Sequence, residues 1–228
     1  MKNGSLKIFS LIIVLGLLLI PKTSNGAFSD PQMIITWKAD SFIPHWYKGR
    51  AMPIRNSNIK TSLVMVDNGK IIDLSQYEIR WNGDNGIFEK GIGFVNFSFE
   101  LDKLISQPQN LTATIVGYNG ENIKKTITIP VLKPEIGLET NLNRILIEKG
   151  GKATLRALPF FFNINNESSI NIKWTVNGKI LTKESGEKLV ELTVPKFRNE
   201  RFAIDLLAEN RYQELEIASE TKYFNSNN

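Results

Sequence analysis

The sequence predicts an all-β protein in which two β-sandwich domains stand in tandem behind an N-terminal signal peptide. A stretch that alternates apolar and polar residues and ends in tryptophan occurs twice, at Tyr77–Trp81 and Ile170–Trp174, about 90 residues apart. A turn that contains glycine follows each copy. Most other apolar segments are short and alternate with a period of two, which is the pattern of half-buried strands. We therefore predict that Trp81 and Trp174 anchor the structural cores of two separate sandwiches.

Residues 1–26 are predicted to be a secretory signal peptide. Lysines flank the apolar run Ile8–Ile20, no acidic residue is present, and small residues stand just before the expected cleavage point after Gly26. The run is shorter than the ~20 apolar residues that a membrane span needs. We expect an exported mature chain without a membrane span, with retention of the leader as an anchor as the alternative.

Charge and cysteine content exclude some classes of function. The 228 residues include 28 Lys+Arg and 23 Asp+Glu. Lys2, Lys7 and Lys22 belong to the predicted leader, so the mature chain is close to neutral and has no dense basic block. Nucleic acid is therefore not an expected partner. The chain has no cysteine, so an exported domain depends on its apolar core for stability rather than on disulfides.

The first predicted domain spans residues 27–132. Its expected strands are 33–38, 59–66, 71–74, 77–81, 94–99, 111–116 and 124–129. A loop rich in aromatic residues, 40–53, separates the first two strands. We expect Leu101–Ile105 to form one helical turn of the kind found at sandwich corners.

The second predicted domain spans residues 133–228, after a short connector that is stiffened by prolines. Its expected strands are 135–139, 144–148, 153–158, 170–176, 179–181, 189–194, 202–208 and 215–218. Proline has no N–H to donate to a strand ladder, so Pro159 is expected to end the strand before it.

Two short motifs resemble known families. The stretch Trp81–Gly86 is similar to the glycine-rich turn of PKD-like domains, and Trp174–Gly178 resembles the Trp-x-x-Asn-Gly hairpin of bacterial immunoglobulin-like repeats. The layout also resembles uncharacterised exported proteins of candidate-phylum bacteria, through Thr36–Ala39 and Arg156–Phe161. The resemblance implies tandem immunoglobulin-like or PKD-like sandwiches and an exported location, and it implies no activity.

Two aromatic groups are candidate binding residues. Phe42, Trp46 and Tyr47 could form a platform on which sugar rings stack. The alternative is that these rings fold back and cap the core of the first domain. Phe160–Phe162 places aromatic rings on both faces of an extended segment, so one face leaves its own core. That face could contact the first domain or a partner subunit, unless a bulge after Pro159 turns all three rings inward.

No residue pattern indicates catalysis, a metal or a cofactor. His45 is the only histidine, and no Gly-x-Ser-x-Gly motif is present. The oxygen donors of Asn82–Gly86 could hold calcium, but turn chemistry explains the same residues. Acidic residues are scattered and form no recognisable pair.

Three functional hypotheses remain at this point. The first is a non-enzymatic cell-envelope or surface protein that acts in adhesion, as a scaffold or in assembly, with another envelope or surface protein as its partner. The second is a carbohydrate-binding module that binds a glycan through the aromatic loop. The third is a hydrolase whose site is assembled from dispersed acids.

Overall fold

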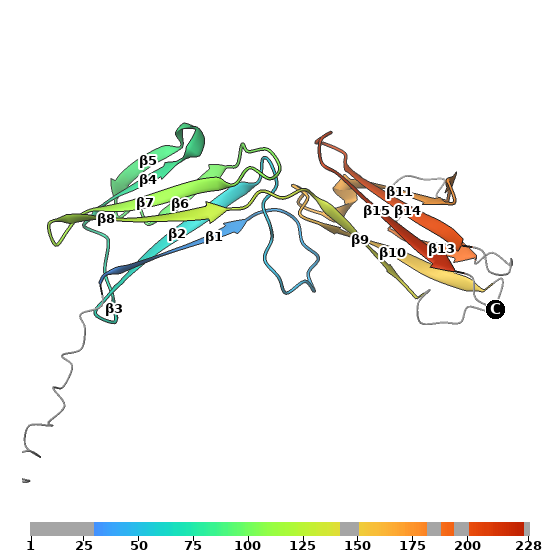
Figure 1. Cartoon of the computed structure of the whole chain (residues 1–228), viewed down its shortest axis with the longest axis horizontal. Coiled ribbons are helices and arrows are strands. Elements are labelled where there is room, and N and C mark those ends of the chain that lie inside the picture. Colours follow the sequence, from blue (N-terminus) through green and yellow to red (C-terminus); the bar gives the residue numbers. More distant parts are fainter. Residues whose placement is uncertain (1–29, 142–150, 182–187, 194–200, 226–228) are drawn as a thin grey trace, which may run out of the picture.

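The computed structural model of the chain describes residues 30–141, 151–181, 188–193 and 201–225 (Figure 1). Within these ranges the chain is built from β-strands and short turns, with two single turns of 3-10 helix and no α-helix. Figure 1 shows two sandwiches end to end, with one loop of the first lying at the junction. The predicted signal peptide and the predicted strand 144–148 lie outside the described residues.

Two antiparallel sheets form the first sandwich. Sheet A contains β1 (Gln32–Ala39), β2 (Asn58–Asp67), β3 (Lys70–Ile71) and β6 (Asn96–Glu100). Sheet B has the order β5 (Phe88–Ile92), β4 (Glu78–Gly83), β7 (Gln109–Tyr118) and β8 (Glu121–Ile129), with the 3-10 turn η2 (Asp84–Gly86) after β4. The predicted edge strand 71–74 is observed as the shorter β3.

The second sandwich follows the same plan. Sheet C has the order β13 (Leu189–Thr193), β10 (Lys152–Phe160) and β9 (Glu135–Thr140). Sheet D has the order β12 (Lys179–Ile180), β11 (Ile170–Val176), β14 (Arg201–Asn210) and β15 (Ile217–Asn225), and the 3-10 turn η3 (Glu167–Ser169) precedes β11.

Trp81 and Trp174 each lie fully buried, in two separate cores. Trp81 packs between sheets A and B, stacks on Phe97 with ring centroids 5.7 Å apart, and donates its indole N–H to the carbonyl of Phe94. Trp174 belongs to a separate cluster between sheets C and D. The predicted fold class, two tandem β-sandwiches each with a central tryptophan, is therefore confirmed.

The predicted helical turn at Leu101–Ile105 is wrong. Leu101 is buried, and both its backbone N–H and its backbone carbonyl form hydrogen bonds with the segment just before β2. Its N–H donates to the carbonyl of Ser57, and its carbonyl accepts from Asn56. Because the backbone groups of Leu101 are used across the sheet, they are not available for a helical turn.

The expectation that Pro159 ends its strand is also wrong, because β10 continues to Phe160. Backbone N–H groups along a strand point alternately to its two neighbours. Ala157 donates to Lys188 on the β13 side, so Pro159 faces that same side, beyond the last β13 residue in the ladder. The missing N–H of Pro159 therefore removes no ladder bond, while pairing with β9 continues.

Candidate functional site

The β1–β2 loop, residues 40–57, crosses from the first sandwich to the second. The N–H of Phe42 donates to the carbonyl of Phe162 at 2.7 Å, and the N–H of Phe161 donates to the carbonyl of Phe42 at 2.6 Å. The ring of Phe42 packs against the core of the second sandwich. One residue of the loop is thus joined to the other sandwich by the kind of paired backbone bonds that join strands.

An unusual backbone conformation at Phe161 sets the directions of three consecutive rings. Its φ is 64°, in the left-handed region that bulky residues rarely occupy. The strand alternation therefore breaks, and Phe161 and Phe162 are both buried while Phe160 is only partly buried. Phe162 joins the core of the second sandwich, and Phe160 and Phe161 contact the loop of the first.

Four aromatic rings form a cluster across the junction. Tyr47 lies edge-to-face on Phe160 at 5.3 Å and on Phe161 at 6.3 Å, and Trp46 meets Phe160 at 6.1 Å and 87°. The loop rings thus pack on the second sandwich instead of capping the core of the first. Trp46 alone keeps an open surface, with 44% of its area exposed.

A buried carboxylate lies beside this cluster. Glu216, which is only 5% exposed, follows the turn between β14 and β15. Its two oxygens accept three hydrogen bonds: from the backbone N–H of Asn163 at 2.9 Å, from the side-chain amide of Asn163 at 2.7 Å, and from that of Asn210 at 2.8 Å. Hydrogen bonds to an ionised acceptor are stronger than neutral ones, which offsets the cost of burying the charge.

Asn163 carries this network into the first sandwich. Its side-chain amide also donates to the carbonyl of Arg55 at 2.8 Å, and its side-chain oxygen accepts from the hydroxyl of Ser57 at 2.8 Å. Ser57 is fully buried, and its hydroxyl oxygen in turn accepts from the N–H of Ile54. The polar contacts therefore form one continuous chain from the loop of the first sandwich to Glu216 of the second.

The sequence prediction did not identify Ser57, Asn163, Asn210 or Glu216. Each is a polar residue of the kind that usually lies at the surface or in a turn. Their burial depends on contacts between residues far apart in sequence, for which a single sequence gives no local signal. It did identify the aromatic residues on both sides of the junction and gave a contact of Phe160–Phe162 with the first domain as one alternative, but it did not pair these rings with the loop.

Other candidate residues have structural roles. The carboxylate of Asp84, in the predicted calcium turn, accepts from the N–H of Asn110 and lies 3.6 Å from the ammonium of Lys103. His45 is exposed on the loop. The described residues contain no group of three or more His, Asp or Glu side chains placed to hold a metal ion.

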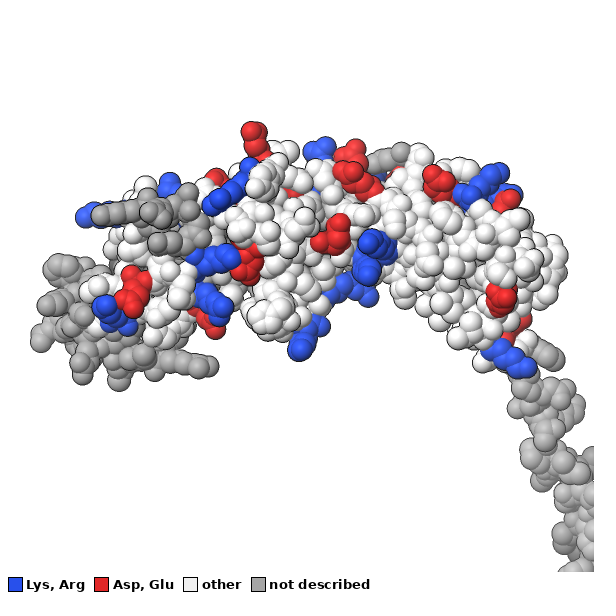
Figure 2. All heavy atoms as spheres, turned by 180° about the vertical axis from the view of Figure 1, so that it is seen from behind, with Lys and Arg blue, Asp and Glu red and all other residues white. Residues whose placement is uncertain are grey.

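Two surface carboxylates have pKa values that hydrogen bonds lower. Hydrogen bonds from the backbone and hydroxyl of Ser75 lower the pKa of Asp73 below its ordinary value. A side-chain hydrogen bond from Arg80 lowers the pKa of Glu78. Figure 2 shows basic and acidic residues interspersed over one face of both sandwiches. In the part of the chain that the structure describes, no helix is long and apolar enough to cross a bilayer.

No protein-family model and no curated relative matches the chain. Solved structures with a similar course include the fibronectin(III)-like modules of Clostridium thermocellum CbhA, at 13% identity over 85% of this chain and 94% of that one, with a TM-score of 0.32. They also include the SGBP-B protein of Bacteroides ovatus in complex with a mixed-linkage heptasaccharide. The match has 16% identity, covers 85% of this chain and 47% of that one, and has a TM-score of 0.25. A third similar structure is the C-terminal fragment of intimin in complex with the intimin-binding domain of Tir. It is 13% identical, the match covers 83% of this chain and 63% of that one, and the TM-score is 0.28. The similarity to these solved structures extends no further than the fold.

Proposed function

We propose that the chain is a non-enzymatic exported protein of the cell envelope or surface, which acts as an adhesion, scaffold or assembly module. In this proposal the domains 27–132 and 133–228 form one stiff arm that holds its loops and sheet faces at fixed positions. The observation that carries the proposal is the junction, where backbone pairing, an aromatic cluster and a buried polar network coincide.

The contacts at the junction are sufficient to oppose bending. Each of the two backbone bonds of Phe42 contributes roughly 1 kcal/mol net. Each aromatic contact of Tyr47 adds about 0.5–1.5 kcal/mol beyond its buried area. Domains in one chain move relative to each other by default unless their interface is extensive, so this density of specific contacts favours a rigid joint.

Rigidity suits a protein that binds rather than catalyses. A surface held in its bound geometry avoids the entropy cost of ordering when it meets a partner. The predicted leader supports export, and the scattered charge supports protein or glycan partners over nucleic acid.

The rigid arm can be tested in solution with the mature chain, residues 27–228. The small-angle scattering curve should fit a single arrangement of the two sandwiches. The residual dipolar couplings of both sandwiches should fit a single alignment tensor. In the Tyr47→Ala and Phe160→Ala double variant, the couplings of each sandwich should still fit its own structure, but the two sandwiches should require separate alignment tensors. Separate alignments in the unmodified protein would contradict the stiff-arm proposal.

Location requires its own experiment. A tagged chain expressed in its native host should be released by protease treatment of intact cells or recovered from the envelope fraction. Recovery of the tag only from the cytoplasm would contradict the proposed exported role.

The glycan-binding alternative now depends on the ring of Trp46 alone. Phe42 and Tyr47 are engaged in the junction, while Trp46 retains 44% exposure and could stack on one sugar. If glycan binding through this loop occurs, Trp46→Ala should abolish it on a glycan array while junction alignment is retained. An array with no signal for the unmodified chain would reject this alternative.

A further inference from the structure

The turn between β14 and β15, residues 211–216, exposes two large apolar side chains. Tyr212 is 81% exposed and Leu215 is 82% exposed, the highest values among the large hydrophobic residues that the structure describes. Tyrosine is among the side chains that contribute most to binding at protein interfaces. An isolated exposed apolar residue needs no explanation, so the surroundings of the pair decide whether this turn is a binding surface.

The turn is held firmly in its conformation. The N–H of Asn210 donates to the carbonyl of Glu216 at 3.0 Å, and the N–H of Glu216 donates to that of Gln213 at 3.0 Å. The N–H of Tyr212 donates to the side-chain oxygen of Asn210 at 3.0 Å, and that of Arg211 donates to the carbonyl of Ser169 at 3.0 Å. The exposed side chains of Tyr212 and Leu215 are therefore presented by a backbone that is already ordered, which lowers the entropy cost of binding.

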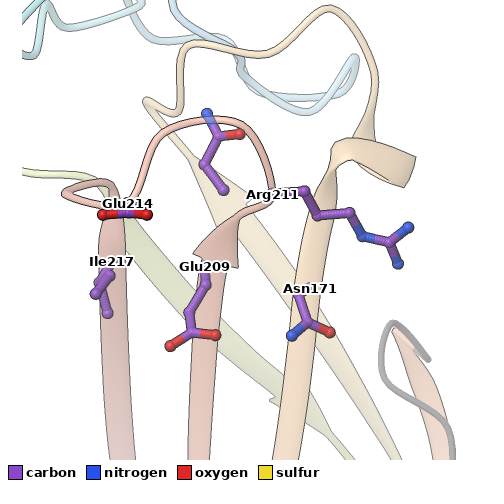
Figure 3. Close-up of a pocket in the computed structure, with 6 residues that line it drawn as sticks. Asn171, Glu209, Arg211, Glu214 and Ile217 are labelled. Atoms are coloured by element: carbon purple, nitrogen blue, oxygen red, sulfur yellow. The ribbon is translucent and has the colours of Figure 1, made fainter.

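A hollow of about 440 Å³ lies next to this turn, on the outer face of sheet D. Asn171, Glu209 and Ile217 are direct neighbours across β11, β14 and β15, so their side chains share one face. Figure 3 shows these three side chains on the same side of the sheet, with Glu214 above them on the turn. Arg211, also at the rim, extends past β11 and away from Glu209.

The hollow presents two carboxylates, those of Glu209 and Glu214. Among the ion pairs of the described residues, none includes either of them. The side-chain oxygen of Asn171 has no hydrogen-bond partner within these residues, but it is buried and Figure 3 shows it directed away from Glu209, so the hollow does not offer it to a ligand. A cationic group at this point would gain charge-assisted hydrogen bonds to the two carboxylates.

These features select a ligand class. Two carboxylates beside the apolar side chain of Ile217 match a cationic group with several N–H donors on an aliphatic stem. A guanidinium satisfies this best, because its planar fork can bond a carboxylate in bidentate fashion while its methylenes pack on an apolar floor. Tyr212 and Leu215 are both exposed, and they are one aromatic ring and one aliphatic side chain rather than a pair of rings, which favours a protein partner over a sugar.

We infer that this end of sheet D binds a protein partner that inserts an arginine side chain into the hollow and covers Tyr212 and Leu215 with an apolar surface. The inference rests on the proposed partner-binding role and names the chemistry of the partner. The site lies close to the junction, because Gln213 of the same turn accepts a hydrogen bond from Asn56 of the first sandwich at 3.4 Å. The stiff joint thus fixes the position of the hollow relative to the first sandwich.

The test uses the mature chain and two small probes of equal shape. N-acetyl-arginine amide, titrated to millimolar concentrations, should shift the backbone NMR signals of Asn171, Glu209 and Ile217. N-acetyl-citrulline amide, which replaces the guanidinium with a neutral urea, should bind at least about tenfold more weakly. Equal shifts with both probes, or none with the arginine probe, would overturn the inference.

Variants assign the effect to the hollow. Glu209→Gln with Glu214→Gln should weaken binding of the arginine probe about tenfold, since both charges are lost. Glu89→Gln removes an exposed charge from β5 of the first sandwich and should leave binding unchanged. Unchanged spectra elsewhere verify folding, and undiminished binding by the double variant would overturn the site.

The apolar part and the glycan alternative need separate probes. The probe N-acetyl-Leu-Arg-Leu amide should bind more tightly than N-acetyl-arginine amide, and Tyr212→Ser should remove that gain. Shifts of the same signals by cellohexaose, without a response to the arginine probe, would assign the hollow to a sugar instead. Neither result depends on the scattering measurements, so failure of this inference leaves the stiff-arm proposal to its own test.

Discussion

Replacement of Glu216 by alanine tests how much the buried carboxylate at the junction stabilises the second sandwich. The substitution removes three hydrogen bonds to a carboxylate that is only 5% exposed, at 2.9, 2.7 and 2.8 Å. Bonds to charged groups contribute roughly 1.5–3 kcal/mol each, and they are not additive because Asn163 supplies two of them. The donors of Asn163 and Asn210 would be left without an acceptor, so we expect Glu216→Ala to destabilise the second sandwich by about 3–5 kcal/mol.

Two further variants make the reasoning specific. Glu216→Gln keeps one acceptor oxygen but turns an amide N–H₂ toward a donor, so we expect a smaller loss of about 1–3 kcal/mol. Glu220→Ala changes another acidic residue of β15, one that is only partly buried, and should alter stability by less than about 0.5 kcal/mol.

Hydrogen exchange gives the free energy of opening for each sandwich separately. The amides of Ile172 and Ile204, both in the core of the second sandwich, should exchange faster in Glu216→Ala. The amide of Ile79, in the first core, should change much less. A loss below about 1 kcal/mol for Glu216→Ala would refute the idea that this network stabilises the second sandwich at its junction end.

Two other predictions concern the loop and the titration of an exposed turn. A Cβ on Gly49 would lie 2.4 Å from the ring of Tyr47, so Gly49→Ala should displace that ring and give the sandwiches separate alignments in dipolar couplings. The backbone N–H and the hydroxyl of Ser75 both lower the pKa of Asp73, and Ser75→Ala removes only the hydroxyl bond, so it should raise that pKa part of the way toward its ordinary value in a carbon-detected NMR titration. The stabilisation from Asp73 is present above its unfolded pKa and is lost as the pH falls through the lower folded value, so an unchanged pKa in the variant would contradict the assignment.

The local architecture could be predicted because its signal is local. Alternating burial along β2 and β10 follows from side chains that point to opposite faces, so the period of two in the sequence predicts strands. The repeated tryptophan predicted two cores because a ring of that size fills the centre of one sandwich. Trp81 and Trp174 are each fully buried in separate clusters.

The errors arose where a neighbouring strand decides the outcome. Pro159 was expected to end β10, but its missing N–H faces a side where the ladder with β13 has already ended. Leu101 was expected in a helical turn, but its backbone pairs with residues before β2. Neither neighbour can be inferred from the few residues around each position.

The junction was out of reach of sequence reasoning for the same reason. Phe42 and Phe162 belong to different predicted domains, and nothing near either residue indicates that a backbone hydrogen bond joins them. Asn163 and Glu216 have the sequence character of surface residues, and only the tertiary fold buries their contact. The aromatic residues gave a partial signal, since an excess of rings on an extended segment predicts a contact outside its own sheet.

The polar contact between Ser57 and Asn163 joins residues 106 positions apart and has a consequence for biosynthesis. Domains of a growing chain tend to fold in order from the N-terminus, so the loop that carries Ser57 would be ready before Asn163 has been made. The second sandwich would then fold against the loop of the first sandwich, which is already ordered. A fragment that starts at residue 133 lacks this loop, and we expect it to fold more slowly and to aggregate through the uncovered rings of Phe160 and Phe161.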